Sequence, residues 1–271
     1  MKTRNILLIL GVLLFLVFGI AQIPTILPVS PVTEFVDFLK GMRATGPLEV
    51  GPSGRNLKTW WGFNDFIGND GLETWKYMGS GTGNLSFSLG GTALRPGIQR
   101  LYTGTDITGL ASIYLASSAN FFLFGGGIYT IEGDINVQTL SDGTNTYYLR
   151  FGFGDLYNAD FVDGAYFEYY SPTSANWYRC TASNSTRTKT NTTIAVVAGT
   201  WTRLKVVVNA AGTSVEYFIN GTSVGSNTTN IPTGTGRETG TFLQIIKTAG
   251  TTGRTVDIDW AWIHVELAAT R

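Results

Sequence analysis

Two short stretches of the sequence place carboxylates one residue apart. Glu132-Gly-Asp134 and Asp257-Ile-Asp259 both lie in runs of alternating residue type. Because successive side chains of a strand point to opposite faces, each pair would present both acids on one face. Two carboxylates about 5 Å apart are the reacting pair of a retaining glycosidase. The alternatives without chemistry, which we favour, are an ordinary solvent-facing strand for Glu132 and Asp134 and hydrogen bonding to neighbouring turns for Asp257 and Asp259.

Other catalytic chemistry has less support. His264 is the single histidine, and no Gly-x-Ser-x-Gly segment offers a nucleophile to go with it. We expect His264 at the rim of the core. Gly125-Gly126-Gly127 is not followed by a helix signal, so it does not predict a phosphate-binding loop. The sequence therefore predicts a protein that is not an enzyme, with glycoside hydrolysis kept as the third-ranked function.

Acidic and amide side chains gather in one predicted turn, GDLYNADFVDG. Oxygen ligands of this kind suit calcium, although their spacing matches no fixed template. The calcium ligands that this turn offers are Asp155, Asn158, Asp160 and Asp163. Asp and Asn also occur in turns because they tolerate turn geometry. An ordinary turn is therefore the alternative, and no other cofactor is predicted.

A predicted β-hairpin over 146–154 and 164–170 carries aromatic rings beside charged groups. Strand alternation places these side chains on one shared face. Aromatic rings stack on the apolar faces of sugars, and charged groups bond to sugar hydroxyls. The carbohydrate-binding surface that this pattern predicts consists of Tyr148, Arg150, Tyr166, Glu168, Tyr170 and Trp177. The alternative is that the tyrosines only cover a sheet face or contact another subunit.

The elements that must position these residues are strands. In 271 residues there are 34 glycines, with 13% aromatic and 14% charged residues, which is typical of short strands and tight turns. Leu204, Val206 and Val208 alternate with polar residues, as in a strand with one buried face. Asn220-Gly221 is the dipeptide of a type I′ hairpin turn. This part of the chain therefore reads as an antiparallel meander.

About fifteen strands are predicted between residues 60 and 266. This number favours an all-β fold, a two-sheet antiparallel jelly-roll sandwich. A single cysteine, Cys180, excludes an intrachain disulfide, so buried area must hold the sandwich together. We expect Trp260 in the core and Tyr166 on the outer face. A net charge of zero argues against a nucleic-acid partner.

The N-terminal sequence differs from the rest. Two cations precede the apolar run ILLILGVLLFLVFGIA, which ends in small residues suited to cleavage after Ala21. Residues 1–21 are therefore a predicted signal peptide or membrane anchor, and 22–58 a linker with a short amphipathic helix over 32–42. The sandwich is predicted over 59–271. We expect an exported protein, secreted or anchored at a cell or virion surface, with the N-terminal segment as its only link to a membrane.

The C-terminal third carries a family resemblance. AGTWTRLKVVVNAAGTSVEYFINGTSVGS, then an Ile-Pro segment and the final strand VDIDWAWI, resemble concanavalin A-like lectin/glucanase (laminin-G-like) jelly rolls. Upstream, RPGIQRLYTGTDITGLASIYL and DGAYFEYYSPTSANWYRC are similar to the form of this fold in phage tail-fibre and other virion proteins. The resemblance covers about residues 60 to 267.

The resemblance implies the fold more narrowly than the function, because lectins, glycosidases and structural modules share it. The glucanases of this fold resemble one another in a Glu-x-Asp-x-(x)-Glu strand, which is absent here. We therefore expect a non-enzymatic module that binds a glycan or cell-surface polysaccharide. The alternative is a structural or assembly protein whose jelly roll packs into an oligomer, virion or filament by self-association.

Overall fold

The described part of the chain is an all-β domain. The computed structural model describes residues 50–51, 54–55, 59–64, 75–87, 95, 97–115 and 121–269. By internal contacts the chain divides into two units, Met1–Leu48 and Glu49–Arg271, and every described residue belongs to the second. The predicted signal segment and the helix over 32–42 lie outside the described residues. Within the described ranges, no helix is long and apolar enough to span a membrane.

Two large antiparallel sheets make up the described domain, with a small ribbon of β1 (Val50–Gly51) and β2 (Gly54–Arg55). Across the described residues, the seven-stranded sheet has the order β12 (Thr186–Ala195), β11 (Ser174–Ser183), β10 (Gly164–Tyr170), β9 (Thr146–Gly154), β16 (Gly240–Ala249), β7 (Leu110–Leu115), β4 (Lys76–Ser80).

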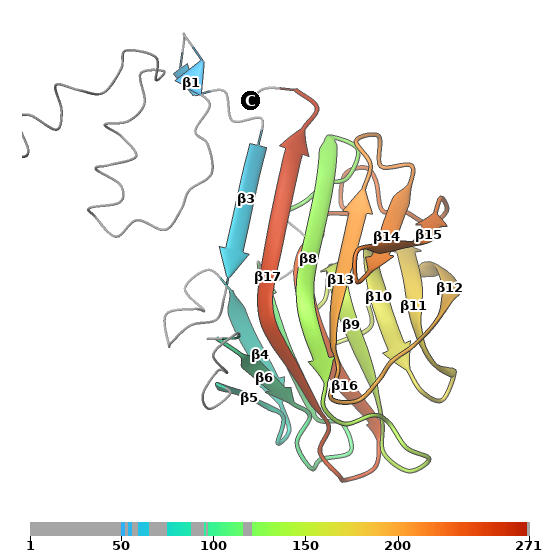
Figure 1. Ribbon diagram of the computed structural model, residues 1–271. Coiled ribbons are helices and arrows are strands. Elements are labelled where there is room, and N and C mark those ends of the chain that lie inside the picture. Colours follow the sequence, from blue (N-terminus) through green and yellow to red (C-terminus); the bar gives the residue numbers. More distant parts are fainter. Residues whose placement is uncertain are drawn as a thin grey trace, which may run out of the picture. The chain divides into compact units, whose positions relative to one another are not determined.

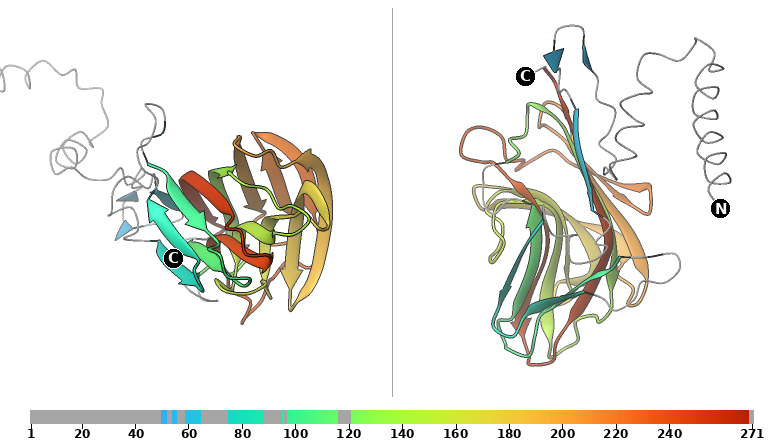
Figure 2. Two further views of the ribbon diagram at one scale, coloured as in Figure 1. Left: turned by 90° about the horizontal axis from the view of Figure 1, so that it is seen from below. Right: turned by 90° about the vertical axis from the view of Figure 1, so that its left-hand side faces the viewer.

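The other sheet has eight strands in the described ranges. Its order is β15 (Thr222–Asn227), β14 (Val215–Ile219), β13 (Trp201–Val208), β8 (Gly127–Val137), β17 (Thr255–Leu267), β6 (Gln99–Tyr102), β5 (Asn84–Phe87), with β3 (Thr59–Asn64) also paired to β17. Figure 1 shows β17, β8 and β13 in the front layer and β9, β10 and β11 behind it. The views of Figure 2 show the two layers face to face. The predicted two-sheet antiparallel sandwich is confirmed.

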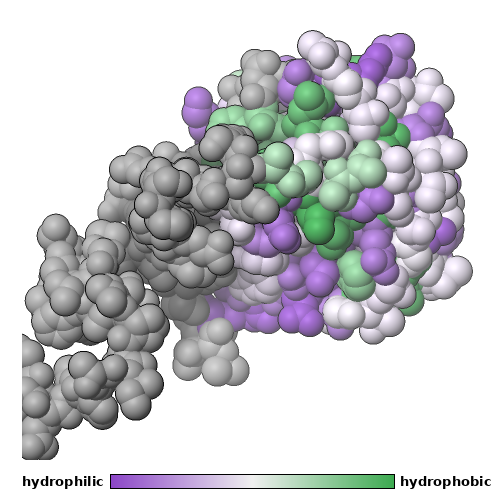
Figure 3. All heavy atoms as spheres, turned by 90° about the horizontal axis from the view of Figure 1, so that it is seen from above, coloured by the Kyte–Doolittle hydropathy of each residue, from purple (hydrophilic) through white to green (hydrophobic). Residues whose placement is uncertain are grey.

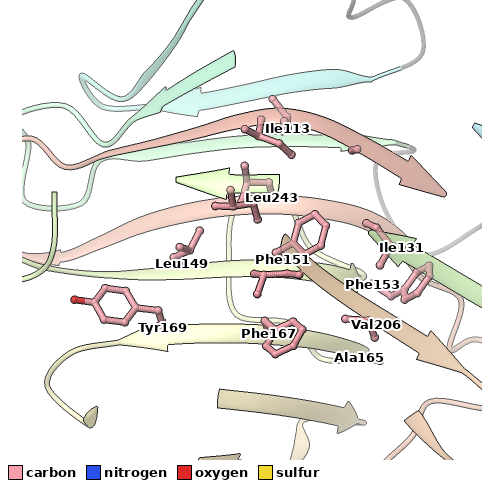
Figure 4. Packing of buried hydrophobic residues seen from close by; sticks show 14 of the residues in the cluster. Ile113, Ile131, Leu149, Phe151, Phe153, Ala165, Phe167, Tyr169, Val206 and Leu243 are labelled. Carbon is pink, nitrogen blue, oxygen red and sulfur yellow. The ribbon is translucent and has the colours of Figure 1, made fainter. Parts of the chain in front are cut away.

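The core lies between the sheets. Phe151 and Leu243 from the seven-stranded sheet point toward Ile131 and Val206 from the eight-stranded sheet (Figure 4), and all four side chains are fully buried. At about 25 cal/mol per Å² of apolar area removed from water, such a core is the main stabilising term of the domain. A sandwich without a disulfide depends on it.

The predicted meander is present as β13, β14 and β15. Leu204, Val206 and Val208 are buried, as their alternation predicts. Asn220 and Gly221 both have positive φ, at 51° and 83°, which is the geometry of a type I′ turn. The Asn220 side chain also accepts a hydrogen bond from the Arg203 amide at 2.9 Å, which fixes the turn against β13.

The expectation that Trp260 lies in the core is wrong. Ile258 and Ala261 of β17 pair with Ile135 and Gly133 of β8, so two residues of β17 oppose one residue of β8 between these pairs. This β-bulge resets the alternation. As a result Ala261 is buried in the core, whereas Trp260 is half-buried on the outer face.

Candidate functional site

Strand register brings a row of polar side chains across the outer face of the seven-stranded sheet. Glu168 of β10 pairs with Arg150 of β9, and Arg150 pairs with Gln244 of β16. On the other side, Glu168 pairs with Tyr178 of β11, and Tyr178 pairs with Asn191 of β12. Residues that are directly paired point to the same face. These five residues from five strands therefore form one continuous row.

Charged side chains meet around this row in what we call the charged cluster, which consists of Arg150, Asp160, Glu168, Arg187 and Lys189. Arg150 Nε donates to Glu168 Oε2 at 2.8 Å, and Lys189 Nζ donates to Glu168 Oε1 at 2.5 Å. Asp160 carries the second negative charge. Its Oδ1 lies 2.9 Å from Arg150 Nη2, and its Oδ2 lies 2.8 Å from Arg187 Nη1.

The ionisation of Glu168 is fixed by these neighbours. Burial of the side chain opposes its charge, but the positive charges of Arg150 and Lys189 outweigh burial and hold the pKa of the Glu168 carboxyl below its ordinary value. Arg150 itself is only 2% exposed. A buried ion pair of this kind is stable only when each charged atom has a partner. Arg150 meets this condition, because Nη1 donates to Gln244 Oε1 at 3.1 Å.

Residues 155–163, which we call the covering loop, lie over this part of the sheet. Phe161 packs against Tyr166 and Phe242, with ring centroids 4.9 and 5.4 Å apart. Gln244 Nε2 donates to the carbonyls of Leu156 and Ala159 at 3.3 and 3.2 Å. Tyr166 consequently has no exposed surface, and the expectation that it lies on an open face is wrong.

Sequence reasoning missed the covering loop, although glycines signal its position. A Cβ at Gly154 would lie 2.6 Å from the Phe161 ring, so only glycine lets the loop approach this closely. Gly164 follows the loop directly and has the same constraint, since its Cβ would meet the carbonyl of Phe153 at 2.7 Å. Two glycines that bracket an aromatic loop between strands are the signal that was available.

Three tyrosines remain partly exposed beside the cluster, and we call Tyr148, Tyr170 and Tyr178 the tyrosine strip. The rings of Tyr148 and Tyr170 stack with centroids 4.0 Å apart and an interplanar angle of 19°. Arg150 Cζ lies 4.4 Å from the Tyr148 ring, and Lys189 Nζ lies 4.6 Å from the Tyr178 ring. The strip therefore joins the open part of the sheet face to the charged cluster.

Trp177 does not belong to this surface. Its side chain is buried among the residues between the sheets, where it meets Phe167 and Tyr169 edge-on at 6.2 and 6.4 Å. Trp177 alternates with Tyr178 along β11, so Tyr178 faces outward in its place. Of the six predicted binding residues, five lie on the outer face, and Trp177 is corrected to a core residue.

The four predicted calcium ligands do not converge. Asp163 pairs with Arg237 at 3.0 Å, and Asp160 pairs with the two arginines of the cluster. Asp155 accepts the Val162 amide at 3.0 Å, and burial raises the pKa of its carboxyl. Asn158 is exposed. In the described ranges, no three His, Cys, Asp or Glu side chains form a group that could hold a metal ion.

The two carboxylate pairs lie on the outer face of the other sheet. Glu132 lies 3.3 Å from Arg203, and Asp134 lies 2.8 Å from Arg95. The buried Asp259 also pairs with Arg95. Arginines thus pair with carboxylates of β8 and of β17.

The remaining acid and the single histidine have structural contacts. Asp257 accepts two hydrogen bonds from Arg100, at 2.7 and 2.8 Å. His264 lies half-buried on the outer face of β17, where it stacks on Trp262 at 5.4 Å. The expectation that His264 lies at the core rim is therefore wrong, again because the bulge sets which residues face outward.

A family model described as "SO2946-like, C-terminal domain" matches residues 94–259. No curated protein matches the sequence. Among solved structures, the chain is similar to a protein of unknown function, SO2946, from Shewanella oneidensis MR-1. The TM-score is 0.58 at 14% identity, over 92% of this chain and 99% of that one.

An endo-1,3-beta-glucanase from Streptomyces sioyaensis is also similar, with a TM-score of 0.50 at 14% identity, over 82% of this chain and 99% of the glucanase. At such identities the likeness concerns the fold alone. It supports the jelly-roll fold that the sequence resemblance implies. The narrower resemblance to phage and virion proteins gains no support from these matches.

Proposed function

We propose that this chain, which belongs to the family of SO2946-like C-terminal domains, is a non-enzymatic module that binds carbohydrate outside the cytoplasm. The proposed location follows from the predicted signal segment over 1–21. The proposed partner is a glycan or polysaccharide of a cell surface.

The observation that carries the proposal is the tyrosine strip. Tyr170 offers the outer face of a partly exposed ring, whose other face stacks on Tyr148, and Tyr178 continues the strip toward β12. Stacking of a sugar on a ring needs such a preformed apolar surface, with polar groups at its border to bond the hydroxyls. Asn191 supplies such a group, because its Nδ2 lies 3.4 Å from the Tyr178 hydroxyl.

The ionisation of the acids favours binding over hydrolysis. A glycosidase needs a carboxyl with a raised pKa as its general acid, close to a second carboxylate and to the sugar. Glu168 has the opposite property, since Arg150 and Lys189 lower its pKa despite burial. Asp155 has a raised pKa, but its side chain is buried at the base of the covering loop.

The test is binding of the full-length chain to an array of glycans. We expect saturable binding that Tyr170→Ala reduces at least about tenfold and Tyr170→Phe retains. Phe218→Ala is the matched control, because Phe218 is also a partly exposed ring. It lies on the other sheet, where Lys205 Nζ is 4.4 Å from its centroid. Binding that is equally sensitive to both alanine variants would overturn the site. Release of reducing sugar from a bound glycan would overturn the non-enzymatic assignment.

A second candidate function is assembly, favoured by apolar surface at one end of the described domain. Phe121 and Leu123 are 56% and 36% exposed and precede β8. Figure 3, which views this end, shows apolar residues surrounded by hydrophilic ones. Exposed patches of this kind mark contact sites in many proteins. Ordered oligomers that Phe121→Ser disperses, in light scattering after gel filtration, would support assembly, and a monomer at all concentrations would exclude it.

A further inference from the structure

Asp160 has the most exposed side chain of the charged cluster. Its side chain is 52% exposed, whereas the Arg150 side chain that it contacts is 2% exposed. Asp160 is also the only member of the cluster that comes from the covering loop, since the other four lie on β9, β10 and β12. A movement of the loop would therefore remove one negative charge, together with the hydrogen bond that Arg187 Nη2 donates to the Phe161 carbonyl, and leave the contacts of Glu168 with Arg150 and Lys189 in place.

The two guanidinium groups that Asp160 contacts could bind another anion in its place. Glu168 already has both of its oxygens bonded, one to Arg150 and one to Lys189. Arg150 Nη2 and Arg187 Nη1 each contact a different oxygen of the Asp160 carboxylate. Without Asp160, three cations would face a single carboxylate. Two guanidinium groups directed at one carboxylate form a charge-assisted arrangement that a sulfate group can also occupy.

We propose that Arg150 and Arg187 form an anion-binding subsite for an acidic polysaccharide, and that Asp160 occupies this subsite until the ligand displaces it. The ligand is one with a carboxylate or sulfate group on its sugars. The acidic group replaces the Asp160 carboxylate between the two guanidinium groups, and the covering loop moves away from the sheet. This inference rests on the proposed function and adds the chemical class of its ligand.

The anion-binding subsite lies beside the tyrosine strip, so one polysaccharide could contact both. Arg150 Cζ lies 4.4 Å from the ring of Tyr148, which stacks on Tyr170. A polysaccharide with one sugar on the Tyr170 ring would therefore have to extend past Tyr148 to bring the acidic group of a neighbouring sugar to Arg150. Arg187 is anchored for the same role, since its Nε donates to the Tyr166 hydroxyl at 3.2 Å while Nη1 contacts Asp160.

The experiment compares charged and neutral forms of the same polymers. Full-length protein is titrated with polygalacturonate and its fully methyl-esterified form, and with dextran sulfate and dextran. These two pairs separate carboxylate from sulfate recognition. We expect the acidic polymer of at least one pair to bind at least about tenfold more tightly than its neutral form, and the difference to fall with added salt.

Two variants then test the role of Asp160. Asp160→Asn removes the competing charge with little change of shape and should tighten binding of the acidic polymer about tenfold, while Arg187→Gln should weaken it about tenfold. Asp106→Asn, the same substitution at an exposed residue of the loop between β6 and β7, should change nothing. If Asp160 only fastens the loop, Asp160→Asn will leave binding unchanged or weaken it, and the inference is wrong.

Hydrogen exchange at the contact between the loop and the turn after β11 gives a second readout that does not depend on affinity. Displacement of the loop should make exchange at the Ser185 amide, which donates to the Val162 carbonyl at 2.9 Å, faster when the acidic polymer is bound. Slower or unchanged exchange would contradict displacement. Binding of the neutral polymers with no preference for charge would overturn this inference alone. The absence of binding to any polymer, combined with a negative glycan array, would overturn the proposed function as well.

Discussion

Arg150 keeps its positive charge although its side chain is nearly buried. Burial favours loss of its proton, yet the negative charges of Glu168 and Asp160 keep the pKa of the guanidinium above its ordinary value. Its Nε, Nη1 and Nη2 each have an acceptor, on Glu168, Gln244 and Asp160. Removing one partner of such a pair leaves an uncompensated charge and typically costs about 3 to 5 kcal/mol. The arrangement is therefore sensitive to single substitutions.

Glu168→Gln should reduce the free energy of unfolding by about 3 kcal/mol at pH 7. The pKa of the Glu168 carboxyl in the folded state lies below the ordinary value of 4.5. Its stabilising contribution is therefore complete above about pH 4.5 and is lost as the pH falls through the folded-state pKa. The difference between wild type and variant should accordingly shrink below about pH 4. Urea unfolding at pH 7, 5, 4 and 3 measures it.

The matched control for this titration is Glu266→Gln, which removes a carboxylate from an exposed position on β17. It should change the free energy of unfolding by less than about 0.5 kcal/mol at any of these pH values. An equal loss of stability for Glu168→Gln at pH 3 and pH 7 would mean that the amide disturbs packing. The charge on Glu168 would then not be the source of stability.

At the scale of elements, the bulge in β17 decides which residues face inward. Before the bulge, Ile258 points into the core, and after it Ala261 and Ile263 do so. The alternation within β13 and β14 could be predicted because those strands contain no such interruption. The residue types of Asp259 and Trp260 do not predict that β17 has an extra residue at this point. The position of Trp260 therefore follows from pairing with β8, which the sequence of β17 alone does not contain.

The bulge predicts different outcomes for deletion of two tryptophans of β17. Deletion of Trp260 removes the extra residue and keeps Ile258 and Ala261 facing the core, so the domain should fold with a loss of about 2 kcal/mol. Deletion of Trp262 shifts the rest of the strand by one residue and turns Ile263 and Val265 outward. Losing the burial of these two side chains costs about 3 to 6 kcal/mol.

Thermal unfolding followed by circular dichroism, together with the yield of soluble protein, measures both deletions. The comparison is internally controlled, because each variant loses one half-buried tryptophan from the same strand. If deletion of Trp260 is as damaging as deletion of Trp262, the bulge is a required part of the fold and not a removable insertion.

At the scale of the whole molecule, the sandwich could be predicted from local patterns, but the state of its outer face could not. The rule that alternate residues share a face correctly grouped Arg150 with Tyr148 and Glu168 with Tyr170. It could not reveal that the covering loop closes over Arg150. That closure depends on Phe161 meeting Phe242, which lies on a strand far along the chain. Contacts between segments distant in sequence are not encoded in strand periodicity.

The sandwich is also closed by polar contacts between its sheets near β11 and β15. Arg179 Nη1 donates to the Val224 carbonyl at 2.8 Å, and the Thr181 hydroxyl donates to the Thr229 carbonyl at 2.8 Å. Inside this edge, the Tyr217 hydroxyl donates to the Cys180 carbonyl at 2.5 Å. These contacts join β14 and β15 of one sheet, and the segment after β15, to β11 of the other.

Tyr217→Phe tests how strongly this edge holds the two sheets together. The substitution keeps the ring, which packs edge-on against Phe167 at 5.2 Å, and removes the hydroxyl, which donates to the buried Cys180 carbonyl and also bonds to the Tyr166 backbone. Loss of the partner of a buried polar group costs about 1 to 3 kcal/mol, so we expect a loss of about 2 kcal/mol in urea unfolding, with faster hydrogen exchange in β15. Tyr129→Phe is the matched control: its hydroxyl donates to the carbonyl of the exposed Leu123 at 2.7 Å, where water can replace it, so the loss should stay below about 1 kcal/mol. Equal losses in the two variants would show that the contact between Tyr217 and Cys180 stabilises the sandwich no more than a surface hydrogen bond does.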